Sequence, residues 1–192
     1  MRIRCLPLVL ALVLAACGDS GDAATTTPRP AAASSKAVAA RLAEAPAALR
    51  TNAADADTLA GEGVDALRKR VVRLRGHALI VNQWASWCAP CRAEFPLLAD
   101  AVAEHGDEVA FLGIDFMDDR GAAADFMRES PPGFASIYDP KGEATREMGG
   151  GRGAPTTFFV APDGTLAYKK IGAYVDAAAL EADIRTYALD AR

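Results

Sequence analysis

Two apolar runs constrain the fold of this 192-residue chain more than any other feature. Residues 78–84 (ALIVNQW) and 109–116 (VAFLGIDF) are almost continuously apolar, as is typical of strands buried on both faces of a sheet. Between them, residues 88–105 are predicted to form a helix, with apolar side chains from Phe95, Leu97, Leu98 and Val102. A strand, a helix and a second strand in this order predict two parallel strands joined by a crossover helix.

The remainder of the chain extends this pattern. Five further elements are predicted: a helix at 120–129, a short strand at 137–138, a brief helix at 143–148 and strands at 156–160 and 166–170. The last two strands flank Ala-Pro-Asp-Gly, which predicts an antiparallel hairpin. A final helix is expected to begin at Asp176, a residue type that suits the N-cap. The expected fold is α/β, a central mixed β-sheet flanked by helices, in one domain over 63–192.

The first sixteen residues are predicted to be a signal peptide rather than part of this fold. Arg2 and Arg4 give a basic start, and an apolar run follows at 6–15. The sequence LAAC at 14–17 resembles the lipobox of bacterial lipoproteins, which implies that Cys17 becomes the lipidated first residue. An ordinary signal peptide that ends near a cysteine by chance is the alternative.

Residues 17–62 are expected to link the lipidated N-terminus to the domain. The segment 18–35 is rich in Gly, Ser, Thr, Pro and Ala without a hydrophobic period, which is typical of a flexible tether. The segment 36–60 is rich in alanine, and Pro46 interrupts its weak helical spacing, so it is predicted as a weak helix or more linker. Convincing amphipathic helix spacing begins at Gly63.

Charge and hydropathy exclude several classes of partner. Without residues 1–16 the chain has 19 Lys and Arg residues against 25 acidic residues, a net charge of −6. Because no basic run or basic-aromatic face is present, nucleic acid is not expected as a partner. No later stretch reaches the roughly 18 apolar residues of a membrane helix. The mature protein is therefore expected to contact the bacterial membrane through its lipid alone. We also expect it to be extracytoplasmic and a monomer.

After processing, Cys88 and Cys91 are the cysteines left for chemistry, in the sequence CAPC. A c-type haem would need His after the second cysteine, where this chain has Arg92. A structural zinc site would need four ligands, and the chain adds only two distant histidines, so no metal is expected. A peroxiredoxin would carry a hydroxyl residue at the position of Ala85. Binding of Cu(I) by the two thiolates remains an alternative.

Redox chemistry fits this cysteine pair best. A strand that ends at Trp84 and a helix that begins near Cys88 would place the first thiol at a helix N-terminus, which stabilises a thiolate. Cys91 lies almost one turn further on, and Pro90 suits the first turn because it lacks an N–H. We therefore expect Cys88 to form a mixed disulfide and Cys91 to resolve it, with no cofactor besides the redox-active disulfide.

Together these motifs resemble the thioredoxin superfamily, and within it the TlpA/ResA branch of membrane-anchored thiol-disulfide oxidoreductases. The resemblance covers about residues 63–192 and rests on five features: the lipobox, Asn82, WCAPC after a buried strand, CRAEFP, and GAPTTFFVAPDG. It implies a thioredoxin-like fold and disulfide exchange at Cys88 and Cys91.

The resemblance also implies roles for residues around the pair. Spacing alone leaves Glu94 either solvated or buried, whereas the resemblance implies that it carries the proton of the resolving thiol. Pro155 matches the family's cis-proline, which presents backbone to the substrate together with Ala154. Trp87 and Pro90 are expected to contact the substrate.

Two positions depart from the family, and one loop needs an explanation. Gln83 stands where relatives usually have an aromatic residue, and Ala154 is smaller than the usual branched residue. The glycine run at 149–153 lacks the Lys-Ser/Thr of a P-loop, and we expect it to give flexibility near the substrate groove.

The resulting functional hypothesis is an extracytoplasmic oxidoreductase that reduces disulfides of exported proteins. The branch it resembles serves cytochrome c maturation, which makes apocytochrome c a candidate substrate. A membrane electron donor would return the electrons to the pair. A disulfide oxidase or isomerase of the same fold is the first alternative, and a Cu(I)-handling lipoprotein is the second.

Overall fold

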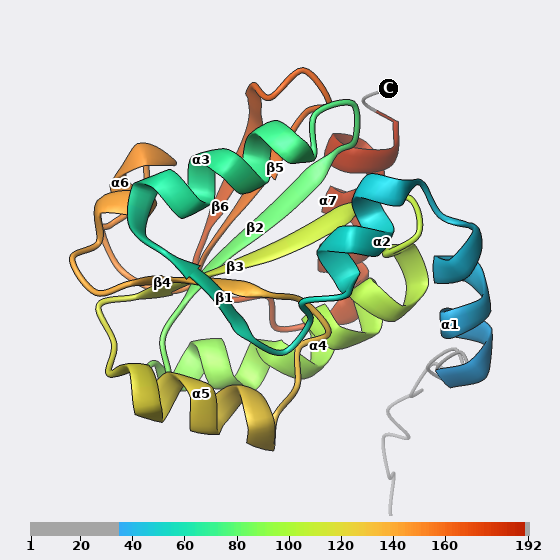
Figure 1. The fold of residues 1–192 in the computed structure, drawn as a ribbon. Helices are drawn as coiled ribbons and strands as arrows, with labels where there is room; N and C mark the ends of the chain where they lie inside the picture. Colours follow the sequence, from blue (N-terminus) through green and yellow to red (C-terminus); the bar gives the residue numbers. More distant parts are fainter. Residues whose placement is uncertain (1–34, 191–192) are drawn as a thin grey trace, which may run out of the picture. The chain divides into compact units, whose positions relative to one another are not determined.

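The computed structural model describes residues 35–190, so the predicted signal peptide and Cys17 lie outside the described residues. Its sheet contains six strands: β1 (Leu59–Glu62), β2 (Leu79–Trp84), β3 (Ala110–Phe116), β4 (Ser136–Asp139), β5 (Thr156–Val160) and β6 (Leu166–Ile171). Their order is β1-β4-β3-β2-β5-β6 (Figure 1). The first four are parallel, whereas β5 runs antiparallel to β2 and β6 antiparallel to β5. The predicted mixed α/β sheet is confirmed.

Helices cover both faces of this sheet. Its helices are α1 (Ser35–Glu44), α2 (Ala47–Ala53), α3 (Gly63–Arg73), α4 (Ala89–His105), α5 (Arg120–Glu129), α6 (Glu143–Glu147) and α7 (Ala177–Ile184), which continues into a π-helical turn (Arg185–Leu189). Figure 1 shows α3 and α6 on one face of the sheet and α4 and α5 on the other.

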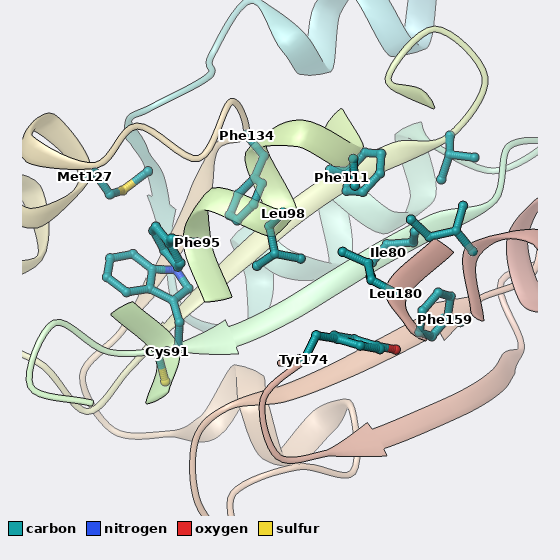
Figure 2. Packing of buried hydrophobic residues seen from close by; sticks show 14 of the residues in the cluster. Ile80, Cys91, Phe95, Leu98, Phe111, Met127, Phe134, Phe159, Tyr174 and Leu180 are labelled. Atoms are coloured by element: carbon teal, nitrogen blue, oxygen red, sulfur yellow. The ribbon is translucent and has the colours of Figure 1, made fainter. Parts of the chain in front are cut away.

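Each face has its own apolar core. On the α4 face, Phe95 from α4 and Phe126 from α5 pack with Trp84, and the same cluster extends to side chains of α7. Figure 2 shows Cys91 at one end of this cluster, and Phe159 and Leu180 toward the other. The α3 face is filled by aliphatic side chains of β2 and β3 that pack against α2, α3 and α6. Strands β2 and β3 are therefore buried on both sides, as their continuous hydrophobicity predicted.

The fold begins before the predicted boundary at residue 63. Strand β1 pairs with β4 at the sheet edge, and Leu49 of α2 is buried in the α3-face core. Asn52 donates from Nδ2 to the carbonyl of Phe111 at 2.9 Å, which ties α2 to β3. Pro46 is the N-cap of α2, so the interruption in the sequence marks the start of a second helix and not more linker. The sequence does not reveal these helices because alanine-rich turns carry little periodic signal.

Within residues 35–190, no helix is both long enough and apolar enough to cross a membrane.

Candidate active site

The predicted cysteine pair forms a disulfide at the start of α4. Cys88 is the N-cap residue, and its sulfur accepts a hydrogen bond from the backbone N–H of Cys91 at 3.3 Å. Pro90 occupies the second position of the helix, where no intrahelical hydrogen-bond donor is needed. Both cysteines have little solvent exposure, 4% for Cys88 and 0% for Cys91. A reduced Cys88 would therefore face the unpaired N–H groups of the first helical turn, which favour a thiolate.

Glu94 is buried beneath the pair, one turn beyond Cys91 on α4. Its Oε1 accepts a hydrogen bond from Asn82 Nδ2 and its Oε2 one from the backbone N–H of Tyr174, both at 2.9 Å. Burial raises the pKa of Glu94 to about 7, although these two hydrogen bonds and the charge of Lys170 act in the opposite direction. The solvated alternative for Glu94 is wrong, because β2 and the chain after β6 enclose it.

The two tryptophans beside the motif have different environments. Trp84 is fully buried, lies edge-on to Phe95 with ring centroids 5.0 Å apart, and donates from Nε1 to Ser136 Oγ at 3.0 Å. Trp87 is 59% exposed, and its Nε1 donates to the carbonyl of Met117 at 3.2 Å. Trp84 thus supports the core, whereas Trp87 offers a large surface next to Cys88.

Asp118 holds the loop that precedes Cys88, a contact that sequence reasoning missed. Its carboxylate accepts hydrogen bonds from the backbone N–H of Ser86 and from the Ser86 hydroxyl, the latter at 2.9 Å. Together with the contact between Met117 and Trp87, these bonds fix residues 86–87 against the loop after β3. No local sequence pattern predicts this contact, because Ser86 and Asp118 lie 32 residues apart.

Asp115 is a second buried carboxyl on the α4 face. It is fully buried and pairs with Trp84 in the register of β2 and β3. Burial, reinforced by the neighbouring Asp118 carboxylate, raises the pKa of Asp115 to about 9. Asp115 is therefore protonated and uncharged at pH 7, which lowers the cost of burying it.

Ala154 and Pro155 lie at the same end of the sheet as the disulfide. The peptide bond between them is cis, as the resemblance implies. Thr156, the next residue, pairs with Gln83 of β2, which places Pro155 beside the strand end that leads to Cys88. Pro155 is buried and its carbonyl accepts a hydrogen bond from the backbone N–H of Gly172 at 3.0 Å, whereas Ala154 is half-buried.

Metal-ligating side chains gather elsewhere in the described part of the chain. Glu104, His105 and Glu181 form the one group of three found within residues 35–190. It lies at the opposite end of the 17-residue α4 from Cys88, about 25 Å away at 1.5 Å per residue. His105 Nε2 is already 2.8 Å from a Glu181 oxygen, so this group links α4 to α7.

A cysteine pair at a helix N-terminus, after the central strand of a mixed sheet, with a buried carboxyl beneath it, defines the class of thioredoxin-like thiol-disulfide oxidoreductases. Comparison with known sequences specifies the family. The chain belongs to the AhpC/TSA family, whose profile matches residues 52–169.

Named relatives agree with this class. The chain is 33% identical over 132 residues to "Thiol:disulfide interchange protein CycY" of Rhizobium leguminosarum, covering 68% of this chain and 69% of that one. It is 39% identical over 100 residues to "Thiol:disulfide interchange protein DsbE" of Allochromatium vinosum, covering 52% and 54%. The chain thus spans only about half of that DsbE sequence.

Solved structures give the same fold. A crystal structure from Corynebacterium diphtheriae, described as a DsbF homologue, superposes with a TM-score of 0.55 at 28% identity, covering 60% of this chain and 75% of that one.

Proposed function

We propose that this protein reduces disulfide bonds of exported proteins, using the Cys88–Cys91 dithiol as the source of electrons. One observation carries the proposal: the two cysteines are joined as a disulfide at the N-terminus of α4, directly after the central strand. The names of the relatives, thiol:disulfide interchange proteins, support the same chemistry.

The proposed reaction has two exchange steps. The Cys88 thiolate attacks one sulfur of the substrate disulfide, forms a mixed disulfide and releases the first substrate thiolate. Cys91 then loses its proton and attacks the Cys88 sulfur, which releases the second substrate thiolate. The substrate gains two electrons, and the pair is oxidised to the disulfide seen in the structure. A membrane dithiol donor returns the electrons by the reverse exchange, and no further cofactor takes part.

Glu94 is the proposed acceptor for the proton of Cys91. It lies one turn beyond Cys91 on the same helix, and its pKa of about 7 lets it take up and release a proton near neutral pH. Hydrogen bonds from Asn82 and from the backbone of Tyr174 keep its two oxygens in place.

Substrate contacts are proposed for Trp87, Pro90, Ala154 and Pro155. Trp87 and Met117 together expose a broad apolar surface next to Cys88, since Met117 is 54% exposed. Ala154 and Pro155 lie at the neighbouring strand end. Such a surface suits a polypeptide better than a small polar disulfide.

The setting of the reaction is also part of the proposal. The signal-peptide pattern at 1–16 and the LAAC sequence ending at Cys17 favour an extracytoplasmic protein held at the membrane by its lipid. We propose that it acts as a monomer. Exported proteins with disulfide bonds, including apocytochrome c in cytochrome c maturation, are the proposed substrates.

Insulin reduction tests the proposed activity. With dithiothreitol as electron donor, we expect the wild type to precipitate insulin chains well above the uncatalysed rate, and the Cys88→Ser variant to fall to background. A titration of the reduced protein with Cu(I) addresses the alternative. Tight 1:1 copper binding together with no insulin reduction would identify a copper-handling protein and refute the proposal.

A further inference from the structure

Gln83 is a fully buried polar residue in β2 whose role the dithiol chemistry does not explain. Neighbouring residues of a strand point to opposite faces. Asn82 points toward α4 and Glu94, whereas Gln83 points to the other face, toward the glycine run at 149–153. There its Nε2 donates to the carbonyl of Gly153 at 2.9 Å, and its Oε1 accepts from the backbone N–H of Gly151 at 3.4 Å.

The glycine run depends on such contacts for its path. Gly149, Gly151 and Gly153 have φ angles of +78°, +94° and +140°, in the region that favours glycine, and they contribute no side chains that could hold the loop. Gly150 is packed so closely that a Cβ there would lie 2.6 Å from Gln83 Oε1. The loop backbone therefore rests directly on the Gln83 amide, and the flexibility expected from its sequence is restrained.

Four other hydrogen bonds hold the loop within the described residues, and one of them runs from the N–H of Gly149 to the carbonyl of Arg146 at 2.9 Å. Lys169 Nζ donates to the carbonyl of Gly149 at 2.9 Å, and the N–H of Gly150 donates to the carbonyl of Thr145 at 2.9 Å. At the far end, the hydroxyl of Thr156 donates to the carbonyl of Gly153 at 3.3 Å. Gln83 spans Gly151 and Gly153, the exposed residues that lead directly into Ala154.

We propose that Gln83 is a positioning residue for polypeptide substrates: by bracing the glycine loop 149–153 it fixes the backbone of Ala154 beside the dithiol. This inference rests on the proposed function, since Ala154 matters only if a substrate chain lies against it. A small disulfide has no polypeptide chain to align, so its reduction does not depend on the contacts between Gln83 and the glycine loop.

The Gln83→Met variant tests this role, because methionine has a similar volume and can make neither hydrogen bond. We expect the KM for insulin to rise about fivefold or more, as for the loss of a hydrogen bond, while kcat changes less than about twofold. The rate with a small aromatic disulfide and the equilibrium with glutathione should stay within about twofold of the wild type. Gln83→Asn, which keeps a buried amide too short to span both glycines, is the second variant in case methionine impairs folding.

Asn52→Leu is the matched control. Asn52 is also a buried amide with two hydrogen bonds, to the carbonyl of Phe111 and from Arg70, but it lies in α2 away from the glycine loop. The Asn52→Leu variant should lower the stability of the protein and leave the KM for insulin unchanged. If the wild type reduces insulin and both Gln83 variants keep its KM, the inference alone is overturned. A wild type that does not reduce insulin overturns the proposed function and this inference together.

Discussion

The two faces of β2 make different contacts near the active site. On the α4 face, Asn82 holds the buried carboxyl of Glu94, so that face is built from side chains and can carry a proton. On the opposite face, Gln83 holds the exposed backbone of the glycine loop and contacts no ionisable group in the bonds that it makes. In the proposed mechanism, the α4 face of this strand end handles protons and the opposite face positions the substrate.

Removing the proposed resolving thiol has the largest expected effect, because the reaction then stops after its first exchange step. In Cys91→Ser, Cys88 can still attack a substrate disulfide, but no second thiol can release the product. We expect turnover at the background rate and a stable mixed disulfide between Cys88 and the substrate. Mass spectrometry after incubation with insulin would detect it, and Cys88→Ser, which should form no adduct, is the control. An adduct-free Cys91→Ser with normal turnover would contradict the assigned roles.

The Glu94→Gln variant removes the proposed proton acceptor on the α4 face and leaves the glycine loop on the other face unchanged. Loss of a proton acceptor typically costs about 100-fold or more, and we expect such a loss in the resolving step at pH 7. Only the carboxylate can accept the proton, so the wild-type rate should rise as the pH passes the Glu94 pKa of about 7. The variant should lack this rise. Stopped-flow rates from pH 5 to 9 measure the difference, and the Gln83→Met defect should be the same across that range.

Asp115→Asn sharpens the comparison by testing the other buried acid of the α4 face. Its folded pKa of about 9 lies above the ordinary value of 3.8, so the folded state retains a proton that the unfolded state has lost. The stability from this proton is complete below pH 4 and is lost as the pH rises through the folded pKa of about 9.

In the oxidised Asp115→Asn protein, we expect the free energy of unfolding to lose the part of its pH dependence that comes from Asp115. The activity should change little. Urea unfolding at several pH values measures it, with Asp163→Asn, which replaces an exposed acid of the β5–β6 turn, as the control. An unchanged pH dependence of the free energy of unfolding would show that Asp115 is ionised in the folded protein.

Much of the frame was predictable because its signals are local. The continuous hydrophobicity of β2 and β3, the turn before β6 and the Asp176 N-cap each lie within a few residues, and all three features are present. The cysteine pair at the start of α4 follows from the same local pattern.

The features that could not be predicted depend on contacts between residues that lie far apart in the sequence. Glu94 is enclosed by Asn82 from β2 and by Tyr174, 80 residues further along the chain. Gln83 meets Gly153 across 70 residues. The packing of α2 and the pairing of β1 also come from tertiary contacts, since short alanine-rich or four-residue segments have little stability of their own.

The reduction potential of the Cys88–Cys91 pair tests the central claim most directly. Equilibration with glutathione redox buffers, followed by quantification of the dithiol and disulfide forms, gives this value. A protein that reduces its substrates should have a potential near the value of about −270 mV for thioredoxin. A potential near the value of about −120 mV for the oxidant DsbA would contradict the account and assign this protein to disulfide formation.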